Sequence, residues 1–284
     1  MWQKLEAIDP RRFEPAEQQL HWAAQFIAMA GQSYLPPQPD DRHTNMGWEA
    51  GTQRICGRIL RQEGVNVQVG IDVPGFRLML MEENGQQLAA TPLEGRTREE
   101  LRQWLEVQLA HLGMPALPLS YIDHYDLPDH PLARGAVFQK PESDLLEAWM
   151  ALRTNAQALL RNVAAAYPTA SEVRIWPHHF DTGVYIPLRQ NEEGTDTHVL
   201  GAGLAMTDQV ANEPYLYVFG WMKNGSIDYG LMPMLEYGRW SKGDWKGAYL
   251  AVNRWVIQAD QETAGRRFLT DSMAHLRKAM GENE

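Results

Sequence analysis

The spacing of apolar residues predicts that the chain opens with a helix and continues as an antiparallel meander. Over residues 15–34 the apolar side chains recur at helical spacing. The stripe consists of Leu20, Ala24, Ile27 and Gly31. From Val65 the period changes to two, and valine or isoleucine alternates with polar residues as far as Val73. Such alternation is typical of a half-buried strand.

Turn and cap signals mark the elements that follow. Asn84-Gly85 indicates a hairpin, so about four strands are expected in this part of the chain. Thr97 and Glu100 have the spacing of a capping box, in which each side chain satisfies a backbone amide at the start of a helix. We expect this second helix to end at Gly113.

The second half of the chain repeats this order in outline. A segment that contains five prolines, 114–141, suits a connector at the surface. A long helix is expected from Ser143 to Pro168, because proline ends a helix. The elements expected after it are strands at 171–176, 180–188, 198–205 and 214–222 and a last helix at 256–280.

We therefore predict an α+β protein with two similar halves, each an antiparallel sheet packed against long helices. The first half is 1–113, with the order helix, meander, helix. The proline-rich connector is 114–141. The second half, 142–284, is a helix and a sheet with a helix at the C-terminal end.

Composition and charge narrow the classes of function. The chain has 284 residues, with 36 acidic and 26 basic side chains and a formal net charge of -10. This balance argues against nonspecific binding to nucleic acid or to an anionic membrane, because both need a basic surface. Cys56 is the single cysteine, so no internal disulfide is possible. Neither a signal peptide nor a run of about 18 apolar residues is visible, which predicts a cytoplasmic protein.

Two segments concentrate the residues that could carry chemistry. The first is the hexamer Trp176-Pro177-His178-His179-Phe180-Asp181, and the second runs from Glu213 to Trp221 and is rich in aromatic residues. Imidazoles, carboxylates and large rings gather in this way in a densely packed core or around a bound ligand.

The hexamer predicts a metal site or an acid–base site. If a strand continues from Phe180, then His179 and Asp181 lie on one side of it. Two histidines and a carboxylate suit a divalent transition metal such as Zn²⁺, Fe²⁺ or Mn²⁺. The expected ligands are His178, His179, Asp181 and Glu213. Two alternatives stay open, since the spacing matches no standard metal signature: acid–base or ligand chemistry without a metal, and histidines that only stabilise the core.

Further residues are expected to border a bound ligand. They are Trp176, Tyr217, His43 and His21. Tyr217 belongs to a segment with apolar residues on both faces, so we expect a strand covered on both sides, with Phe219 in the core. We also expect at least one tyrosine hydroxyl of this strand to border the histidine site.

Three segments of the chain resemble a family of uncharacterised bacterial proteins. They are Gln19–Gln25, His43–Trp48 and Trp176–Asp181. The family has similar W-P-H-H-F-D and E-P-Y-x-Y-V segments, is related to a broader domain of unknown function, and is similar to this chain over roughly residues 15–255. Its members tend to read S-P-G-D where this chain has 205–208, so that only Asp208 matches. The resemblance implies an intact α-and-β fold and no particular activity.

Two hypotheses of function follow. The leading one is a cytoplasmic protein that binds a metal or a small ligand, with or without catalytic activity, at a site of histidine, aspartate and glutamate. The alternative is a non-enzymatic structural or protein-interaction protein in which the same residues only stabilise the core.

Overall fold

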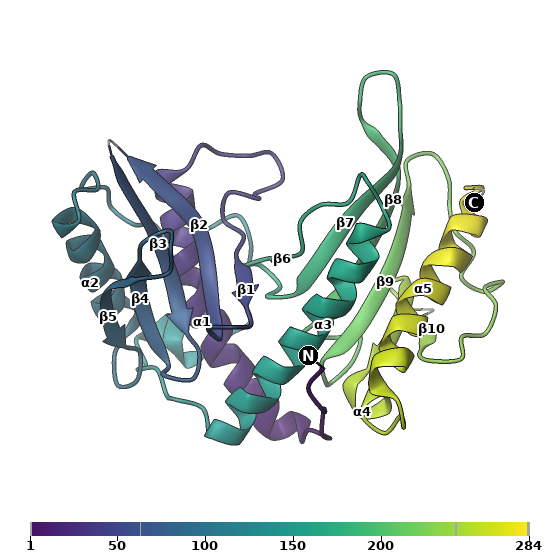
Figure 1. Cartoon of the computed structure of the whole chain (residues 1–284), viewed down its shortest axis with the longest axis horizontal. Helices are drawn as coiled ribbons and strands as arrows, with labels where there is room; N and C mark the ends of the chain where they lie inside the picture. Colours follow the sequence, from purple (N-terminus) through teal and green to yellow (C-terminus); the bar gives the residue numbers. More distant parts are fainter. Residues whose placement is uncertain (1, 63, 242, 283–284) are drawn as a thin grey trace. The chain divides into compact units, whose positions relative to one another are not determined.

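The computed structural model describes residues 2–62, 64–241 and 243–282 and has an α+β fold (Figure 1). Its strands form two antiparallel sheets, one of five strands and one of six. The predicted fold class is therefore confirmed. No helix within the described ranges is both long enough and apolar enough to cross a lipid bilayer.

The five-stranded sheet is a meander whose strands lie in chain order, as the alternation of apolar residues predicted. Its strands are β1 (Gly47–Glu49), β2 (Arg54–Gln62), β3 (Val65–Asp72), β4 (Arg77–Met81) and β5 (Gln87–Pro92). Helix α1 (Pro10–Tyr34) precedes the sheet and α2 (Arg98–His111) follows it. The capping box is confirmed, because Thr97 accepts a hydrogen bond from the Glu100 amide while Glu100 accepts one from the Thr97 amide.

The six-stranded sheet has the order β10-β11-β9-β8-β7-β6. Its strands are β6 (Arg174–Ile175), β7 (Thr182–Gln190), β8 (Asp196–Ala205), β9 (Tyr215–Met222), β10 (Arg239–Ser241) and β11 (Gly247–Ala251). Helix α3 (Ser143–Ala165) precedes it, and the 3-10 turn η1 (Pro131–Arg134) lies in the proline-rich segment. The final helix is shorter than predicted and preceded by another: α4 (Val252–Trp255) ends before α5 (Gln261–Ala279), which Asp260 caps through the Thr263 amide.

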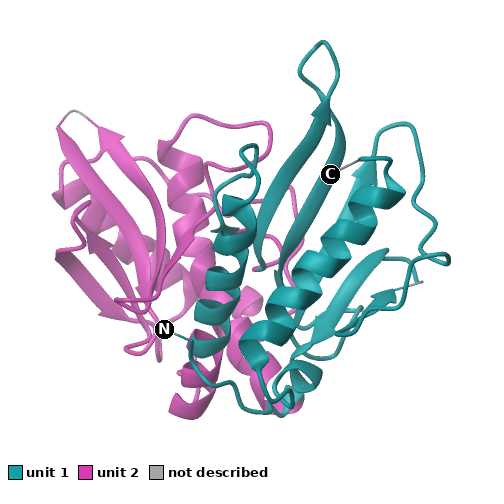
Figure 2. Ribbon diagram, turned by 45° about the vertical axis from the view of Figure 1, so that its right-hand side comes forward, with its two compact units in different colours: residues 1–10, 151–174, 181–284 teal, residues 11–150, 175–180 magenta. Residues whose placement is uncertain are grey.

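Contacts divide the chain into two compact units (Figure 2). Unit 1 consists of residues 1–10, 151–174 and 181–284, and unit 2 consists of residues 11–150 and 175–180. Unit 1 holds all but one residue of the six-stranded sheet, while unit 2 contains the five-stranded sheet and the whole segment 114–141. The chain therefore passes between units at the start of α1, inside α3 and on either side of the segment 175–180.

In unit 1, α5 and the part of α3 that belongs to this unit lie on the same side of the sheet (Figure 2). A Cβ atom placed on Gly265 of α5 would lie 2.7 Å from Leu159 of α3, so the two helices touch. A Cβ atom on Gly220 of β9 would lie 3.4 Å from Leu276 of α5 and 3.5 Å from Met280, the residue that follows this helix. The even-numbered residues of β9 therefore face the helices.

The odd-numbered residues of β9 point to the other face of this sheet. Trp221 is 47% exposed there and Phe219 is half-buried. The ring of Phe219 lies over Gly201 of β8, where an added Cβ atom would be 2.1 Å away. The expectation that both faces are covered is met only at the start of β9, where Tyr215 is 3% exposed. Phe219 lies on the face opposite to α3 and α5 and is half-buried, so it does not belong to the core as expected.

Three side-chain amides hold the N-terminal segment of unit 1. Each amide donates to the backbone carbonyl of one residue and accepts from the backbone N–H of the same residue. The pairs are Gln3 with Asn155, Leu5 with Gln261, and Ile8 with Asn253. These clamps use both hydrogen-bonding groups of each amide, and they connect one extended segment to α3, α4 and α5.

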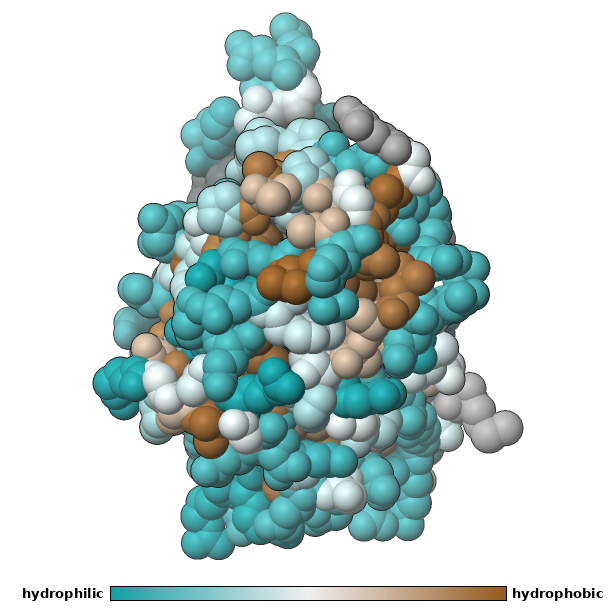
Figure 3. Space-filling model, turned by 90° about the vertical axis from the view of Figure 1, so that its left-hand side faces the viewer, coloured by the Kyte–Doolittle hydropathy of each residue, from teal (hydrophilic) through white to brown (hydrophobic). Residues whose placement is uncertain are grey.

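The surface of the molecule is mixed in polarity. On the face drawn in Figure 3, hydrophilic side chains predominate and hydrophobic ones reach the surface between them. In unit 2, Val107 of α2 is 50% exposed and Leu88 of β5 is 37% exposed. Single exposed apolar side chains are ordinary on folded proteins, so they mark no interface by themselves.

The amide clamps predict a pH-dependent response to Gln261→Glu. Gln261 is 8% exposed, so at neutral pH the introduced carboxylate would be buried beside the Leu5 carbonyl, to which it cannot donate. We expect the free energy of unfolding to fall by about 1–3 kcal/mol. Burial raises the pKa of such a carboxyl, so its protonation should restore part of the loss as the pH falls from 7 to 5.

The measurement is urea unfolding at several pH values, with Gln209→Glu as the control, since Gln209 is an exposed glutamine of the same unit. Equal stability losses in the two variants would show that the clamp at Leu5 contributes nothing.

Candidate functional site

The turn formed by the hexamer is held to α1 within unit 2. The carbonyl oxygen of Pro177 accepts hydrogen bonds from His21 Nε2 (2.8 Å) and from Gln25 Nε2 (2.9 Å). Because a carbonyl can only accept, the Nε2 atom of His21 carries a proton. Gln25 in turn accepts from the hydroxyl of Tyr125, at 2.9 Å. A backbone bridge between Met46 and Ile175 fixes the start of the segment.

Phe180 has a positive φ of 55°, which is rare for a residue with a bulky side chain. Such a conformation costs about 1–3 kcal/mol and persists where the surroundings determine it. Here the ring is fully buried, stacked on His21 with centroids 5.1 Å apart and on Trp149 at 5.7 Å. The Phe180 amide also donates to the carbonyl of Trp176, at 2.7 Å.

This geometry corrects the strand expected from Phe180. The strand β7 begins at Thr182, and residues 177–179 form a turn. The period-two alternation that placed His179 and Asp181 on one face therefore does not apply to them. A positive φ at a buried phenylalanine has no signal in the local sequence, because it arises from the packing of that ring.

The histidines of the turn lie beside each other at the surface of unit 2. The rings of His178 and His179 have centroids 4.5 Å apart, and His179 is exposed while His178 is half-buried. The ring centroids of Trp176 and Tyr125 lie 6.2 and 5.9 Å from the ring centroid of His178. Of the predicted site residues, the structure thus brings Trp176, His178 and His179 together.

His43 is buried elsewhere in unit 2 and both of its ring nitrogens are engaged. Nδ1 accepts a hydrogen bond from the backbone N–H of Gln38 (3.2 Å). Nε2 therefore carries the proton and donates to the side-chain oxygen of Gln32 (3.0 Å). These bonds tie the loop after α1 to the last turns of that helix. The geometry gives His43 a stabilising role within the loop.

Asp181 and Tyr217, which come from the two segments singled out in the sequence, meet in unit 1. The Tyr217 hydroxyl donates to Asp181 Oδ2 at 2.5 Å. Glycines make room for the ring, since a Cβ atom on Gly203 would lie 2.5 Å from it and one on Gly183 would lie 2.9 Å from its hydroxyl. Burial, followed by the nearby Asp181 carboxylate, raises the pKa of Tyr217 well above its usual value.

Glu213 lies at the start of α4 in the same unit. Its Oε2 atom accepts from the backbone amide of Asn253, at 2.6 Å. That amide belongs to the first turn of α4, where backbone N–H groups have no partner within the helix. The first function of Glu213 is therefore to cap α4.

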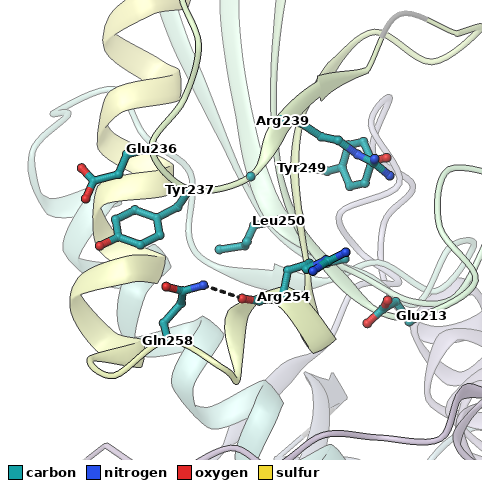
Figure 4. A pocket seen from close by; sticks show the side chains of 10 residues that line it. Glu213, Glu236, Tyr237, Arg239, Tyr249, Leu250, Arg254 and Gln258 are labelled. Carbon is teal, nitrogen blue, oxygen red and sulfur yellow. Dashed lines mark hydrogen bonds between the residues drawn. The ribbon is translucent and has the colours of Figure 1, made fainter.

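Glu213 also lines a pocket of about 450 Å³ in unit 1 (Figure 4). The pocket is bordered by α4, by the segment before β10 and by β11. Its lining residues are Glu213, Glu236, Tyr237, Gly238, Arg239, Tyr249, Leu250, Ala251, Arg254 and Gln258. Figure 4 shows the side chains of Arg239 and Arg254 extending to the side where Tyr249 and Glu213 lie, away from Glu236 and Tyr237.

The charges in this pocket are unequally satisfied. Glu236 forms an ion pair with Arg267 at 2.7 Å, and Glu213 is bound to the Asn253 amide. Arg239 lies over the ring of Tyr249, with its Cζ atom 4.8 Å from the ring centroid. Among the described residues, no carboxylate forms an ion pair with Arg239 or with Arg254.

Sequence reasoning did not find the two arginines of this pocket. Arg239 and Arg254 are 15 positions apart, and each stands alone among neutral neighbours. Their strands and helix, β10, β11 and α4, are three to five residues long, which is too short for a periodic pattern. The only local signal is the turn at Gly238, whose φ is 78°.

No group of three histidine, cysteine, aspartate or glutamate side chains in the described ranges is arranged to hold a metal ion. His178 and His179 belong to unit 2, whereas Asp181 and Glu213 belong to unit 1, where each accepts a hydrogen bond from a neighbour. The metal assignment of these four residues stays a prediction.

Tyr217→Phe tests the bond to Asp181. Removing the hydroxyl deprives the half-buried carboxylate of a donor, so the free energy of unfolding at pH 7 should fall by about 1–3 kcal/mol. In the wild type the folded state keeps the Tyr217 proton above pH ~10, where the unfolded chain releases it. This stabilisation is therefore present below pH ~10 and is lost as the pH rises further.

The alkaline decline in stability should become less steep in the variant, by up to about 1.4 kcal/mol per pH unit. Urea unfolding between pH 7 and 11 measures both effects. An unchanged slope would show that the Tyr217 phenol titrates as in an unfolded chain.

Comparison with models of known families, with curated proteins and with solved structures found no match for this chain. The resemblance to the family with the W-P-H-H-F-D segment stays a prediction, and the site must be judged from its geometry.

Proposed function

We propose that the protein binds a small anionic molecule in the pocket of unit 1, through Arg239 and Arg254. The observation that carries this proposal is the imbalance of charge in the pocket. Both glutamates have partners, whereas neither arginine pairs with a described carboxylate. The pocket volume of about 450 Å³ lies in the range of sites for small molecules.

The chemistry of the guanidinium group supports an oxyanion as the bound group. Arginine presents several N–H donors in a planar fork, which matches the oxygens of a carboxylate or phosphate. Tyr249 flanks Arg239 and restricts its motion, so less side-chain entropy is lost on binding. In a chain of net charge -10, these two cations form a local exception to the overall repulsion of anions.

This proposal keeps one residue of the site expected from the sequence. Glu213 lines the pocket, and by capping α4 it positions the helix that carries Arg254. A catalytic role is not part of the proposal. The cytoplasmic location expected from the sequence stays a prediction, as do the acid–base and metal roles of His178 and His179.

A second function, a purely structural one, is favoured for the histidines on and after α1. His21 donates to the Pro177 carbonyl and stacks on Phe180, and both nitrogens of His43 are bound. We propose that these two residues stabilise unit 2 and take no part in binding a ligand. This role agrees with the alternative hypothesis from the sequence, in which such residues only stabilise the core.

Inorganic phosphate, sulfate and citrate serve as probes to test whether the pocket of Arg239 and Arg254 binds anions. We expect at least one probe to bind the wild type and to raise its melting temperature. Arg254→Gln should weaken that binding at least about tenfold, which corresponds to about 1.4 kcal/mol, because one charge-assisted contact is lost. Isothermal titration calorimetry measures the affinity.

Arg266→Gln is the matched control, since Arg266 is an exposed arginine of the same unit that lies outside the pocket. The proposal fails if none of the three anions binds the wild type at millimolar concentration, or if Arg254→Gln binds the probe as tightly as Arg266→Gln and the wild type do.

The structural role of His21 predicts a contrast with His179. Truncating buried His21 to Ala removes a hydrogen bond and a stacked ring, so we expect unfolding to become easier by about 1–3 kcal/mol. His179→Ala at the exposed position should change stability by no more than about 0.5 kcal/mol. Denaturant unfolding measures the stability of both variants. Similar losses of stability in His21→Ala and His179→Ala would contradict the structural role of His21.

A further inference from the structure

A guanidinium group lies between two aromatic rings in unit 2. The Cζ atom of Arg98 is 4.4 Å from the ring centroid of Trp22 and 3.9 Å from that of Tyr121. The three residues come from the start of α2, from α1 and from the proline-rich segment 114–141. Contacts between a cation and ring faces stabilise the cation only partly.

The charge of Arg98 has no counterion among the described residues. The two acidic residues of the first turn of α2 have other partners: Glu99 binds Arg102 at 2.6 Å, and Glu100 binds the Thr97 amide at 2.8 Å. Burial lowers the pKa of the half-buried Arg98 guanidinium below its usual value. A cation that loses hydration without gaining an anion is destabilising.

Two hydrogen-bond donors of this cluster are buried and unsatisfied. Arg98 Nε and Trp22 Nε1 have no hydrogen-bond partner in the described part of the chain. Trp22 is 5% exposed, so its indole N–H is largely shielded from bulk solvent. Both groups can only donate, and buried polar groups in folded proteins are nearly always paired. What the cluster lacks is an acceptor.

The position of Arg98 in its helix adds to the demand for negative charge. Arg98 is the first residue of α2, and the N-terminal end of a helix carries a partial positive charge. A cation at this end is unfavourable unless an anion lies nearby. Tyr121 is 36% exposed, so the cluster can be reached from solvent past this ring.

We propose that Arg98 and Trp22 form a second binding site, which takes the oxyanion group of a small molecule, a carboxylate or a phosphate. Its oxygens accept hydrogen bonds from Arg98 Nε and from the indole N–H of Trp22, while Tyr121 covers the guanidinium. All of its residues belong to unit 2, whereas the pocket of Arg239 and Arg254 belongs to unit 1. The site therefore does not rest on the function proposed above.

The test follows the indole N–H resonance of Trp22 by nuclear magnetic resonance, assigned by its disappearance in Trp22→Phe. The probes are sodium phosphate and sodium acetate, each added at constant ionic strength against sodium chloride. The titrations use the Arg254→Gln protein, so that the pocket of unit 1 does not contribute. We expect a saturable shift of this resonance with at least one probe, and the more effective probe distinguishes a phosphate from a carboxylate ligand.

Arg98→Gln in the same background should weaken that binding about tenfold or more, since a charge-assisted bond is lost. Trp22→Phe keeps the ring over the guanidinium and removes one donor, so calorimetry should show a smaller loss, about threefold to tenfold. This second variant retains the packing if Arg98→Gln proves too unstable to measure.

The proposal is overturned if the Trp22 resonance does not move with either probe, a result that would indicate ordered water as the partner of both donors. It is also overturned if Trp22→Phe binds the probe as tightly as the parent protein. Weaker phosphate binding in Arg254→Gln than in the wild type, with the shift of the Trp22 resonance retained, would concern only the pocket of unit 1.

Discussion

The structure of unit 1 depends on the pairing of side-chain amides with the backbone of the N-terminal segment. Asn155, Asn253 and Gln261 each satisfy both polar groups of one residue in that segment, so an otherwise unpaired extended chain is held without a neighbouring strand. The clamp between Ile8 and Asn253 matters most for function. The side-chain amide of Asn253 forms this clamp, while its backbone N–H donates to Glu213. Arg254 is the next residue in the chain. Helix α4 forms one wall of the pocket of Arg239 and Arg254. Its orientation is thus set by hydrogen bonds to Ile8, which is about 245 positions away in the sequence.

Both proposed anion sites arise from the same circumstance, which is an arginine without a carboxylate in a protein rich in carboxylates. Several arginines of this chain are paired, such as Arg42 with Asp40 and Arg61 with Glu83. Exposed pairs of this kind contribute little stability, but they show that acidic partners are available. Where a guanidinium instead lies against a tyrosine or tryptophan ring, as at Arg98 and Arg239, its charge stays open to a ligand.

Local patterns were sufficient for the parts of the fold in which local forces dominate. The alternation after Val65 and the Thr97 capping box are both found in the structure, because pleat and helix start are determined by neighbours in the sequence. The site was less predictable. The turn at Phe180 takes its conformation from His21 and Trp149, residues distant in sequence, and the arginines of the pocket are joined only by tertiary packing. Asp181 and Tyr217 were both singled out in the sequence, but for other roles, and the hydrogen bond between them could not be predicted because it depends on the register of the sheet.

The clamp between Leu5 and Gln261 has a consequence for how the protein is made. The two residues are 256 positions apart, and their amide and backbone groups meet in unit 1. During synthesis the first residues leave the ribosome long before Gln261 exists, so their hydrogen-bonding groups must remain hydrated or find temporary partners. Unit 2, whose residues are mostly contiguous, has no such delay. Contacts of this sequence separation slow folding, and domains completed earlier fold first. We therefore expect unit 2 of the nascent chain to fold first, because unit 1 cannot complete its fold until helix α5 has been synthesised.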